Sequence, residues 1–216
     1  NTYLFLDSVV QQPSTPPTAA WPGGAGPDKY FSNGQEFDYG MDPNVVNNPD
    51  PALGGAAQVK AAFAGRDIRT VVDATARGDA DDEFYPTAMA NIIAGAKGGD
   101  VQQIILHGSV GAGKNIEQFP QANFGRMRST LAAKGRAEQR LIDSGIGYTI
   151  IRNGILLSAD LPPTRTARLS TDQRLMRKVT RADLGLLTVK CVGNPDYMNG
   201  IWHAVDDSLD VPPQYR

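Results

Sequence analysis

The stretch IILHGSVGAGKN, residues 104–115, contains residue types that bind phosphate in many enzymes. Its glycines and Lys114 have the spacing of a phosphate-binding loop, in which backbone amides and a lysine surround the anion. However, Asn115 stands where the loop needs a Ser or Thr ligand for Mg²⁺, and Pro120 would fall inside the helix that must follow, at a cost of about 3 kcal/mol. The candidate apolar strand ending in Asp, TVVDA, comes before the stretch and not after it. We therefore interpret it as a glycine-rich turn and not as a nucleotide-hydrolysis motif.

A second interpretation places Ser109 at the carboxyl end of a strand, where doubly wound sheets bind their ligands. Two other predicted strands also end in small or polar residues. The residues at the three strand ends are Ala74, Thr75, Ala76, Gly108, Ser109, Arg152, Asn153 and Gly154. Because parallel strands end at the same edge of a sheet, we expect these loops to open on one rim. Such a rim admits a flat, extended ligand close to the backbone.

The elements that would position these residues alternate from about residue 55 onward. Strands are predicted over residues 68–74, 101–108, 147–154 and 200–206. Helices are predicted over residues 56–65, 85–99, 126–143 and 180–193. Within the third helix we expect Met127, Leu131, Leu141 and Ile142 to face the core, and Thr180 is the expected N-cap of the fourth. This alternation predicts an α/β fold, a Rossmann-like parallel sheet flanked by helices.

The composition changes near residue 52, because eight of the fifteen prolines precede it. Proline removes backbone donors and restricts φ, so residues 11–51 are expected to be irregular. The aromatic side chains of this segment favour packing on this domain or on a protein partner. TYLFLDSVV at the start of the chain is a candidate strand. We divide the chain into an irregular Pro-, Gly- and aromatic-rich segment, residues 1–51, and a Rossmann-like domain, residues 52–216.

Four blocks of sequence resemble the atypical short-chain dehydrogenase/reductases of the NmrA-like, NAD(P)-binding family. They are VVDATA, IILHGSVGAG, KGRAEQRLIDSGIGYTIIRNGIL and VTRADLGLLTVKCV, within about residues 55–205, and residues 134–152 are the most specific part. The resemblance implies a Rossmann-type fold with NAD(P) as cofactor. Ser109 matches the serine that follows the family's fifth strand, and Lys134 matches the lysine of the Tyr-x-x-x-Lys pair that binds the nicotinamide ribose. Both are therefore candidate catalytic residues, and with the strand-end residues they are the candidate cofactor ligands.

The chain departs from this family in two ways. Thr130 stands four residues before Lys134 in place of tyrosine, on the same helix face, and its hydroxyl is too weak an acid to replace a phenol as proton donor. The family also begins with a strand, a glycine-rich turn such as GxxGxxG and a helix, which together hold the pyrophosphate. Residues 1–54 contain no such turn. The N-terminal βαβ part of the fold is thus incomplete or replaced.

Each candidate residue also has a purely structural interpretation. Ser109 can cap a turn, Lys134 can be a solvated helix residue, and Arg152 can form an ion pair at a strand end instead of binding phosphate. The remaining polar candidates are expected to be structural: the acidic run of residues 79–83 at the start of a helix, and the two histidines in strands, His107 and His203.

Composition excludes several classes of protein. The net charge of −2 and pI of about 5.7 give no reason to expect nucleic acid as a partner. A single cysteine, Cys191, and two histidines exclude an internal disulfide and favour no metal site. No apolar run has the length of a transmembrane segment. We expect a protein of a reducing compartment: cytoplasm, plastid stroma or mitochondrial matrix.

Three functions are consistent with these features. The first is an NmrA-like protein with a residual NAD(P)-binding cleft and little dehydrogenase activity. The second is an accessory or assembly subunit of a photosynthetic or respiratory complex, which contacts its partner through residues 11–51. The third is an NAD(P)H-dependent reductase whose glycine-rich half lies outside this chain.

Overall fold

The computed structural model describes residues 2–6, 29–32, 35–38, 56–76, 81–158 and 160–210. Its centre is a sheet in which five parallel strands follow the order β1-β4-β5-β6-β10, and β8 joins the edge antiparallel to β10. These strands are β1 (Thr2–Leu6), β4 (Ile68–Asp73), β5 (Gln103–Ser109), β6 (Gly147–Asn153), β8 (Arg168–Ser170) and β10 (Gly200–Val205). The predicted Rossmann-like parallel sheet is confirmed.

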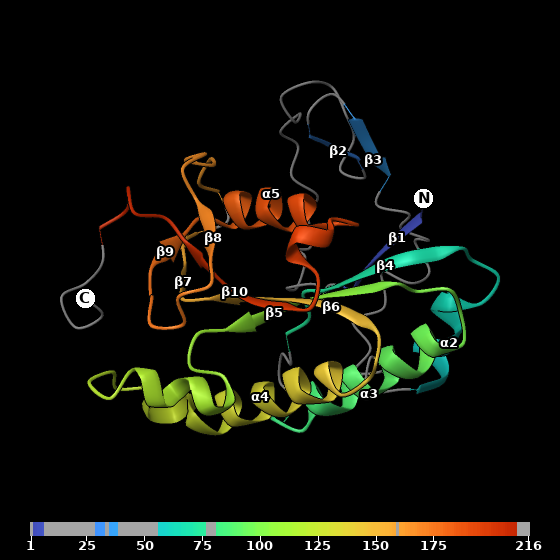
Figure 1. Ribbon diagram of the computed structural model, residues 1–216, viewed down its shortest axis with the longest axis horizontal. Helices are drawn as coiled ribbons and strands as arrows, with labels where there is room; N and C mark the ends of the chain where they lie inside the picture. The colour runs from blue at the N-terminus through green and yellow to red at the C-terminus, as the bar shows by residue number, and fades with distance from the viewer. Residues whose placement is uncertain are drawn as a thin grey trace, which may run out of the picture.

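Helices cover both faces of the sheet (Figure 1). One face carries α2 (Ala56–Phe63), α3 (Phe84–Lys97) and α4 (Arg128–Ile142), and the other carries α5 (Arg181–Cys191). Side chains alternate between the two faces along each strand. Ile104 therefore packs toward α3 and α4, whereas its neighbour Ile105 packs toward α5. Burial on both faces explains why the central strands are continuous apolar runs.

Short 3₁₀ helices and two small sheets complete the described structure. The 3₁₀ helices are η2 (Gly113–Gln118), η3 (Gly125–Met127) and η4 (Pro195–Tyr197). A parallel pair, β7 (Ile155–Leu156) and β9 (Lys178–Val179), lies on either side of β8 in the chain, and β2 (Lys29–Ser32) pairs antiparallel with β3 (Gln35–Asp38). None of the described helices is both long and apolar enough to cross a membrane.

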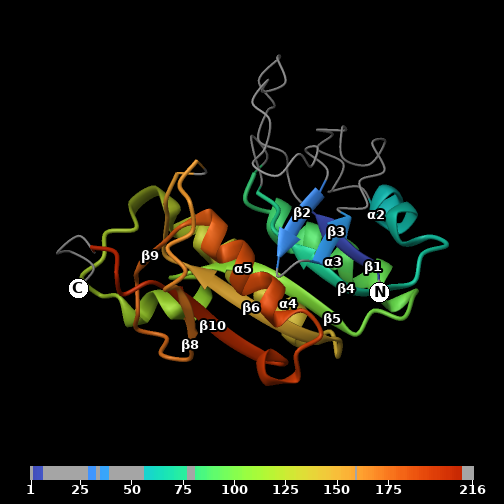
Figure 2. The same ribbon diagram turned by 90° about the horizontal axis from the view of Figure 1, so that it is seen from above.

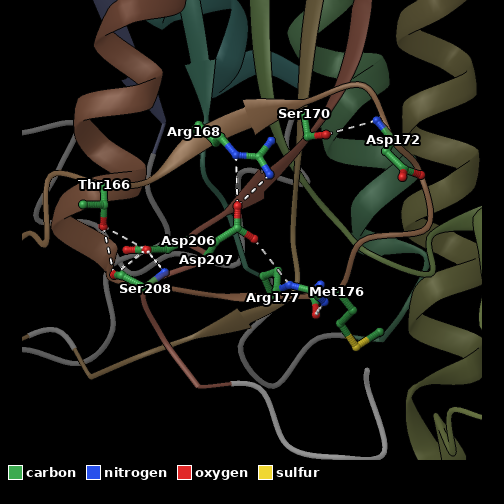
Figure 3. Close-up of polar contacts among 9 residues, drawn as sticks. All are labelled: Thr166, Arg168, Ser170, Asp172, Met176, Arg177, Asp206, Asp207 and Ser208. Atoms are coloured by element: carbon green, nitrogen blue, oxygen red, sulfur yellow. Dashed lines mark hydrogen bonds and ion pairs between the residues drawn. The ribbon is translucent and has the colours of Figure 1, made fainter.

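The chain between β6 and α5 is anchored to the end of β10 and to the start of α5. Figure 3 shows Asp207 between Arg168 and Arg177. The Arg168 Nη2 lies 2.7 Å from the Asp207 Oδ2. The buried Asp183 accepts hydrogen bonds from the backbone amides of Thr164 and Arg165, at 2.8 and 2.9 Å. These contacts hold the segment between β6 and α5 against the sheet.

The helices and strands predicted between residues 55 and 206 are present close to their expected bounds, and the candidate strand at the N-terminus is β1. Thr180 is the N-cap of α5, because its side chain accepts a hydrogen bond from the Asp183 amide at 2.9 Å. The prediction for Met127 was wrong: its side chain is 55% exposed, because it lies in η3 before α4 begins. In contrast, Leu131 and Leu141 are buried as expected, and Ile142 packs at the margin of the core.

The irregular segment predicted for residues 11–51 lies mostly outside the described residues. The parts that are described, β2 and β3, form an antiparallel pair that the sequence analysis did not anticipate. The partner-binding role of this segment stays a prediction.

A contact between two glycines sets the position of the turn after β5. Gly113 has φ of +53°, a conformation that favours glycine, and it lies against Gly135 on α4. A Cβ on Gly135 would lie 2.3 Å from the Gly113 Cα and 2.4 Å from its amide nitrogen. The two backbones are therefore in direct contact, and this contact fixes the position of α4 relative to the turn that follows β5.

We expect Gly135→Ala to lower the free energy of unfolding by about 2 kcal/mol, because the added methyl group forces the turn and helix apart. Gly185→Ala is the matched control: Gly185 lies in α5, and nothing lies within 4 Å of a Cβ there. That control should gain about 0.5–1 kcal/mol from helix propensity. Urea denaturation of both variants measures the difference, and equal stabilities would contradict the packing argument.

Candidate functional site

The rim predicted from three strand ends exists. Ser109 is the last residue of β5 and pairs in register with Asn153, the last residue of β6. On the other side of β5, the register pairs Asp73 at the end of β4 with Leu106. Because the three strands are parallel, Thr75, Ser109 and Asn153 all lie at the same edge of the sheet.

Lys134 reaches this edge from α4. Its Nζ donates a hydrogen bond to the Ser109 Oγ at 2.9 Å and lies 5.0 Å from the centre of the Tyr85 ring. A small cavity beside this pair is lined by Asp73, Thr75, Tyr85, Leu106, His107, Gly108, Lys134 and Ala137. The two candidate catalytic residues are therefore in direct contact, and Lys134 does not have the solvated position of its structural interpretation.

The charges around Lys134 come from two buried carboxylates. Burial lowers the pKa of the Lys134 ammonium, and Asp73 and Glu138 oppose that effect. Burial also raises the pKa of Asp73, which is 4% exposed, although the Oδ1 atom accepts hydrogen bonds from the Thr75 amide and hydroxyl at 3.0 and 2.8 Å. The edge thus places a lysine between acids in a partly dry environment, the type of setting found at functional sites.

Arg152 forms a buried ion pair with Glu138. Its Nη2 lies 2.6 Å from the Glu138 Oε2 and its Nε lies 3.2 Å from the Oε1, while the Nη1 donates to the Gln173 Oε1 at 2.9 Å. Glu138 is 3% exposed and Arg152 is 8% exposed. Burial raises the pKa of Glu138, and the hydrogen bonds and charge of Arg152 oppose it. The structure thus shows Arg152 in an ion pair, the structural interpretation, and its phosphate-binding role stays untested.

Gly108 has to be a glycine because of this ion pair. A Cβ at Gly108 would lie 2.5 Å from the Glu138 Oε1. Because Gly108 has no side chain, β5 lies close enough to α4 for the Glu138 carboxylate to pass over Gly108 and pair with Arg152 on β6. This is a packing requirement of the rim.

Thr130, which replaces the family's tyrosine, faces α3. Its hydroxyl donates to the Asp82 Oδ1 at 2.7 Å. Glu83 forms an ion pair with Arg136, and the Asp81 Oδ1 accepts a hydrogen bond from the Glu83 amide at 2.9 Å. The described part of the acidic run thus lies at the start of α3, as predicted, and no metal-binding group of His, Cys, Asp or Glu side chains occurs among the described residues.

Both histidines have structural contacts. The Thr188 hydroxyl donates to the Leu184 carbonyl at 2.7 Å, so the Nε2–H of His107 donates to the Thr188 Oγ1 at 2.8 Å. Burial, with a smaller effect from Lys134, lowers the pKa of His107 to about 4. The Nδ1 of the fully buried His203 lies 2.7 Å from the Leu175 carbonyl. His107 also lines the rim cavity, which the sequence analysis did not predict.

Two residues from the sequence motifs are structural. Asn115 is buried, accepts a hydrogen bond from the Gly111 amide at 2.7 Å and donates to the Gln173 carbonyl at 2.9 Å. This contact explains the asparagine in the phosphate-loop-like stretch. Burial raises the pKa of the Cys191 thiol to about 12, in agreement with a buried helix position.

Sequence reasoning missed Asp73, Tyr85 and Glu138. Glu138 lies one helical turn after Lys134, so the spacing already placed both on one face of α4. Asp73 ends its strand next to the predicted rim residues. Tyr85 comes from α3, and only the packing of α3 on α4 brings its ring near Lys134.

The fold is that of a Rossmann-type domain. The sequence matches the NAD(P)H-binding family over residues 51–195, and the chain belongs to that family. An uncharacterized chloroplastic protein of Arabidopsis thaliana is 38% identical over 121 residues, which cover 52% of this chain and 36% of the relative. The chain thus matches little more than a third of that relative's length.

Solved structures share the fold. An anaerobillin reductase from Escherichia coli O157:H7 superposes with a TM-score of 0.64 at 23% identity, covering 74% of this chain and 75% of the reductase. A short-chain dehydrogenase/reductase from Veillonella parvula, solved in complex with NADP, has a TM-score of 0.56 at 15% identity, covering 74% of this chain and 73% of that one. At these identities the likeness is one of fold.

We expect Arg152→Met to lower the free energy of unfolding by about 3–5 kcal/mol, because it leaves the Glu138 carboxylate buried without its partner. The double variant Glu138→Gln/Arg152→Met should recover a large part of this loss. Arg168→Met is the matched control, because its exposed ion pair with Asp207 should contribute less than about 1 kcal/mol. Urea denaturation of Arg152→Met, Glu138→Gln and the double variant tests this. If the effects of the two single variants add up to that of the double variant, Glu138 and Arg152 are not energetically coupled.

The low pKa of His107 makes stability depend on pH. Between about pH 6.5 and 4 the unfolded chain binds a proton on this imidazole and the folded chain does not, so the free energy of unfolding falls as the pH falls through this window. The loss from His107 is on the order of 3 kcal/mol. His107→Gln should therefore show a shallower decline than the parent protein. Urea denaturation of both proteins at pH 7, 5.5 and 4 measures this. If the free energy of unfolding falls equally with pH in the variant and the parent, His107 does not have this role.

Proposed function

We propose that this protein binds NAD(P)H through the rim formed by Ser109, Lys134 and the ends of β4 and β6, and that it turns over little by the Tyr–Lys dehydrogenase route. One observation carries the proposal. The Lys134 Nζ lies at the rim, 2.9 Å from the Ser109 Oγ, while the position of the acidic tyrosine holds Thr130, whose hydroxyl donates a hydrogen bond to Asp82.

The polar atoms at the rim fit the ribose and nicotinamide end of the cofactor. An ammonium has three donors, so Lys134 can bind Ser109 and still donate to ribose hydroxyls. The buried Asn153 Oδ1 has no hydrogen-bond partner within the described structure, and a carboxamide N–H is a donor that would satisfy it. Ala74, Thr75 and Ala76 follow β4 with small side chains that permit close approach to the backbone. Bound NAD(P)H supplies a hydride.

Besides the hydride, a reduction needs a proton donor, which the side chains at the rim must supply. Asp73 and Glu138 favour the charged form of Lys134, and the ammonium in turn polarises the Ser109 hydroxyl. Neither Ser109 nor Thr130 is an acid comparable to a tyrosine next to lysine, so proton delivery to a reduced substrate is slow. For this reason we propose cofactor binding with residual activity in preference to an efficient reductase. The chloroplastic relative favours the plastid stroma among the compartments proposed.

Lys134→Met should weaken NADPH binding by tenfold or more, because it removes a charged donor from the ribose position. Lys97→Met is the matched control: this exposed lysine ends α3 outside the rim and should leave the affinity unchanged. Titration calorimetry with NADPH and with NADH measures both the affinity and the preference between cofactors.

The same samples separate residual binding from true reductase activity. NADPH oxidation in the presence of a carbonyl compound should stay near the background rate. Turnover at an ordinary enzymatic rate would contradict the proposal of residual binding and would favour the hypothesis of an NAD(P)H-dependent reductase. Equal NADPH affinity of the Lys134→Met variant and the parent would contradict the proposed site itself.

A further inference from the structure

A second and much larger cavity lies on the other side of α4. It is a groove of about 970 Å³ bounded by one flank of α4, the turn and η2 after β5, and the open part of the sheet at β10. It shares no lining residue with the small cavity beside Lys134. Its size lies at the upper end of the range of ligand pockets, about 300–1,000 Å³. The groove is therefore a feature separate from the rim.

The groove runs along the whole of α4. Its lining residues on this helix extend from Arg128 to Ile142 at helical spacing, with Ala132, Gly135 and Gln139 between them. At 1.5 Å per residue this distance is about 20 Å. α5 lies on the opposite face of the sheet from this groove (Figure 2). The space suits an elongated ligand.

The two ends of the groove differ in chemistry. Lys114 and Arg128 line the end near the turn after β5, and no carboxylate among the described residues forms an ion pair with either. Ile142 and Ile201 line the other end, where α4 finishes and β10 begins, and both pack at the margin of the core. The single acid of the lining, Glu138, is neutralised by Arg152. Free positive charge thus faces an apolar end.

We propose that this groove is a second ligand site, which takes an elongated amphiphile with an anionic head and an apolar tail. The head group, a carboxylate, sulfonate or phosphate, pairs with Lys114 and Arg128. The tail lies along the exposed flank of α4 past Ala132 and Gln139 toward Ile142 and Ile201, where it removes apolar surface from water. Charge and polarity along one continuous groove select this class over a cationic or fully polar molecule.

Dodecanoate below its micelle concentration is a direct probe for titration calorimetry. The parent protein should bind one equivalent, and Arg128→Glu should weaken binding by tenfold or more. Ala132→Trp, at an exposed position inside the groove, should abolish it by filling the space. Arg140→Glu is the matched control: it makes the same charge change on α4 outside the lining and should leave the affinity unchanged.

Dodecyltrimethylammonium, with the same tail and the opposite charge, should bind at least tenfold more weakly than dodecanoate. Equal binding of the two amphiphiles, or equal loss in Arg128→Glu and Arg140→Glu, would overturn the proposal. Lys134→Met should still bind dodecanoate, and Arg128→Glu should still bind NADPH, because the two cavities share no residue. Failure of cofactor binding at the rim is therefore distinguishable from failure of the groove proposal.

Discussion

The buried ion pair between Glu138 and Arg152 is the constraint on which the rest of the site depends. It ties α4 to the end of β6, and it is possible only because Gly108 leaves room for the carboxylate. Lys134 lies one helical turn before Glu138, so fixing that glutamate also fixes where the lysine meets Ser109. An ion pair of this kind contributes position more than stability, because the loss of hydration offsets most of the attraction.

The same ion pair separates two chemical environments on either side of α4. On the side of α3, Asp73, Tyr85 and Lys134 form a compact polar cavity with buried charges. On the side of β10, Arg152 and Glu138 form part of the wall of a long open groove with free cations at one end. A single helix thus borders two sites: Thr130 and Lys134 face α3 and the rim, whereas Arg128, Ala132 and Gln139 line the groove, and Glu138, paired with Arg152, forms part of the groove wall.

Local periodicity made most of the fold predictable. The parallel sheet, the four helices and the Thr180 cap follow from short-range patterns that tertiary packing does not overrule. The Ser109–Lys134 contact was also within reach, since both strand ends and helix faces obey simple geometry. Met127 could not be placed, because its exposure depends on where a 3₁₀ turn gives way to α4. The ring of Tyr85 and the groove both result from how helices far apart in sequence pack, which no local pattern encodes.

The anchoring of the chain before α5 links two parts of the molecule that look independent. Asp183 takes part in the cap of α5, and its carboxylate also accepts hydrogen bonds from the amides of Thr164 and Arg165 in the segment between β6 and α5. If that segment detached, the Asp183 carboxylate, which is only 2% exposed, would lose both of these backbone donors and keep the hydrogen bond from the Thr180 hydroxyl. The first turn of α5 therefore depends for part of its stability on a segment that comes before it in the chain, since one carboxylate takes part in the helix cap and also binds that segment.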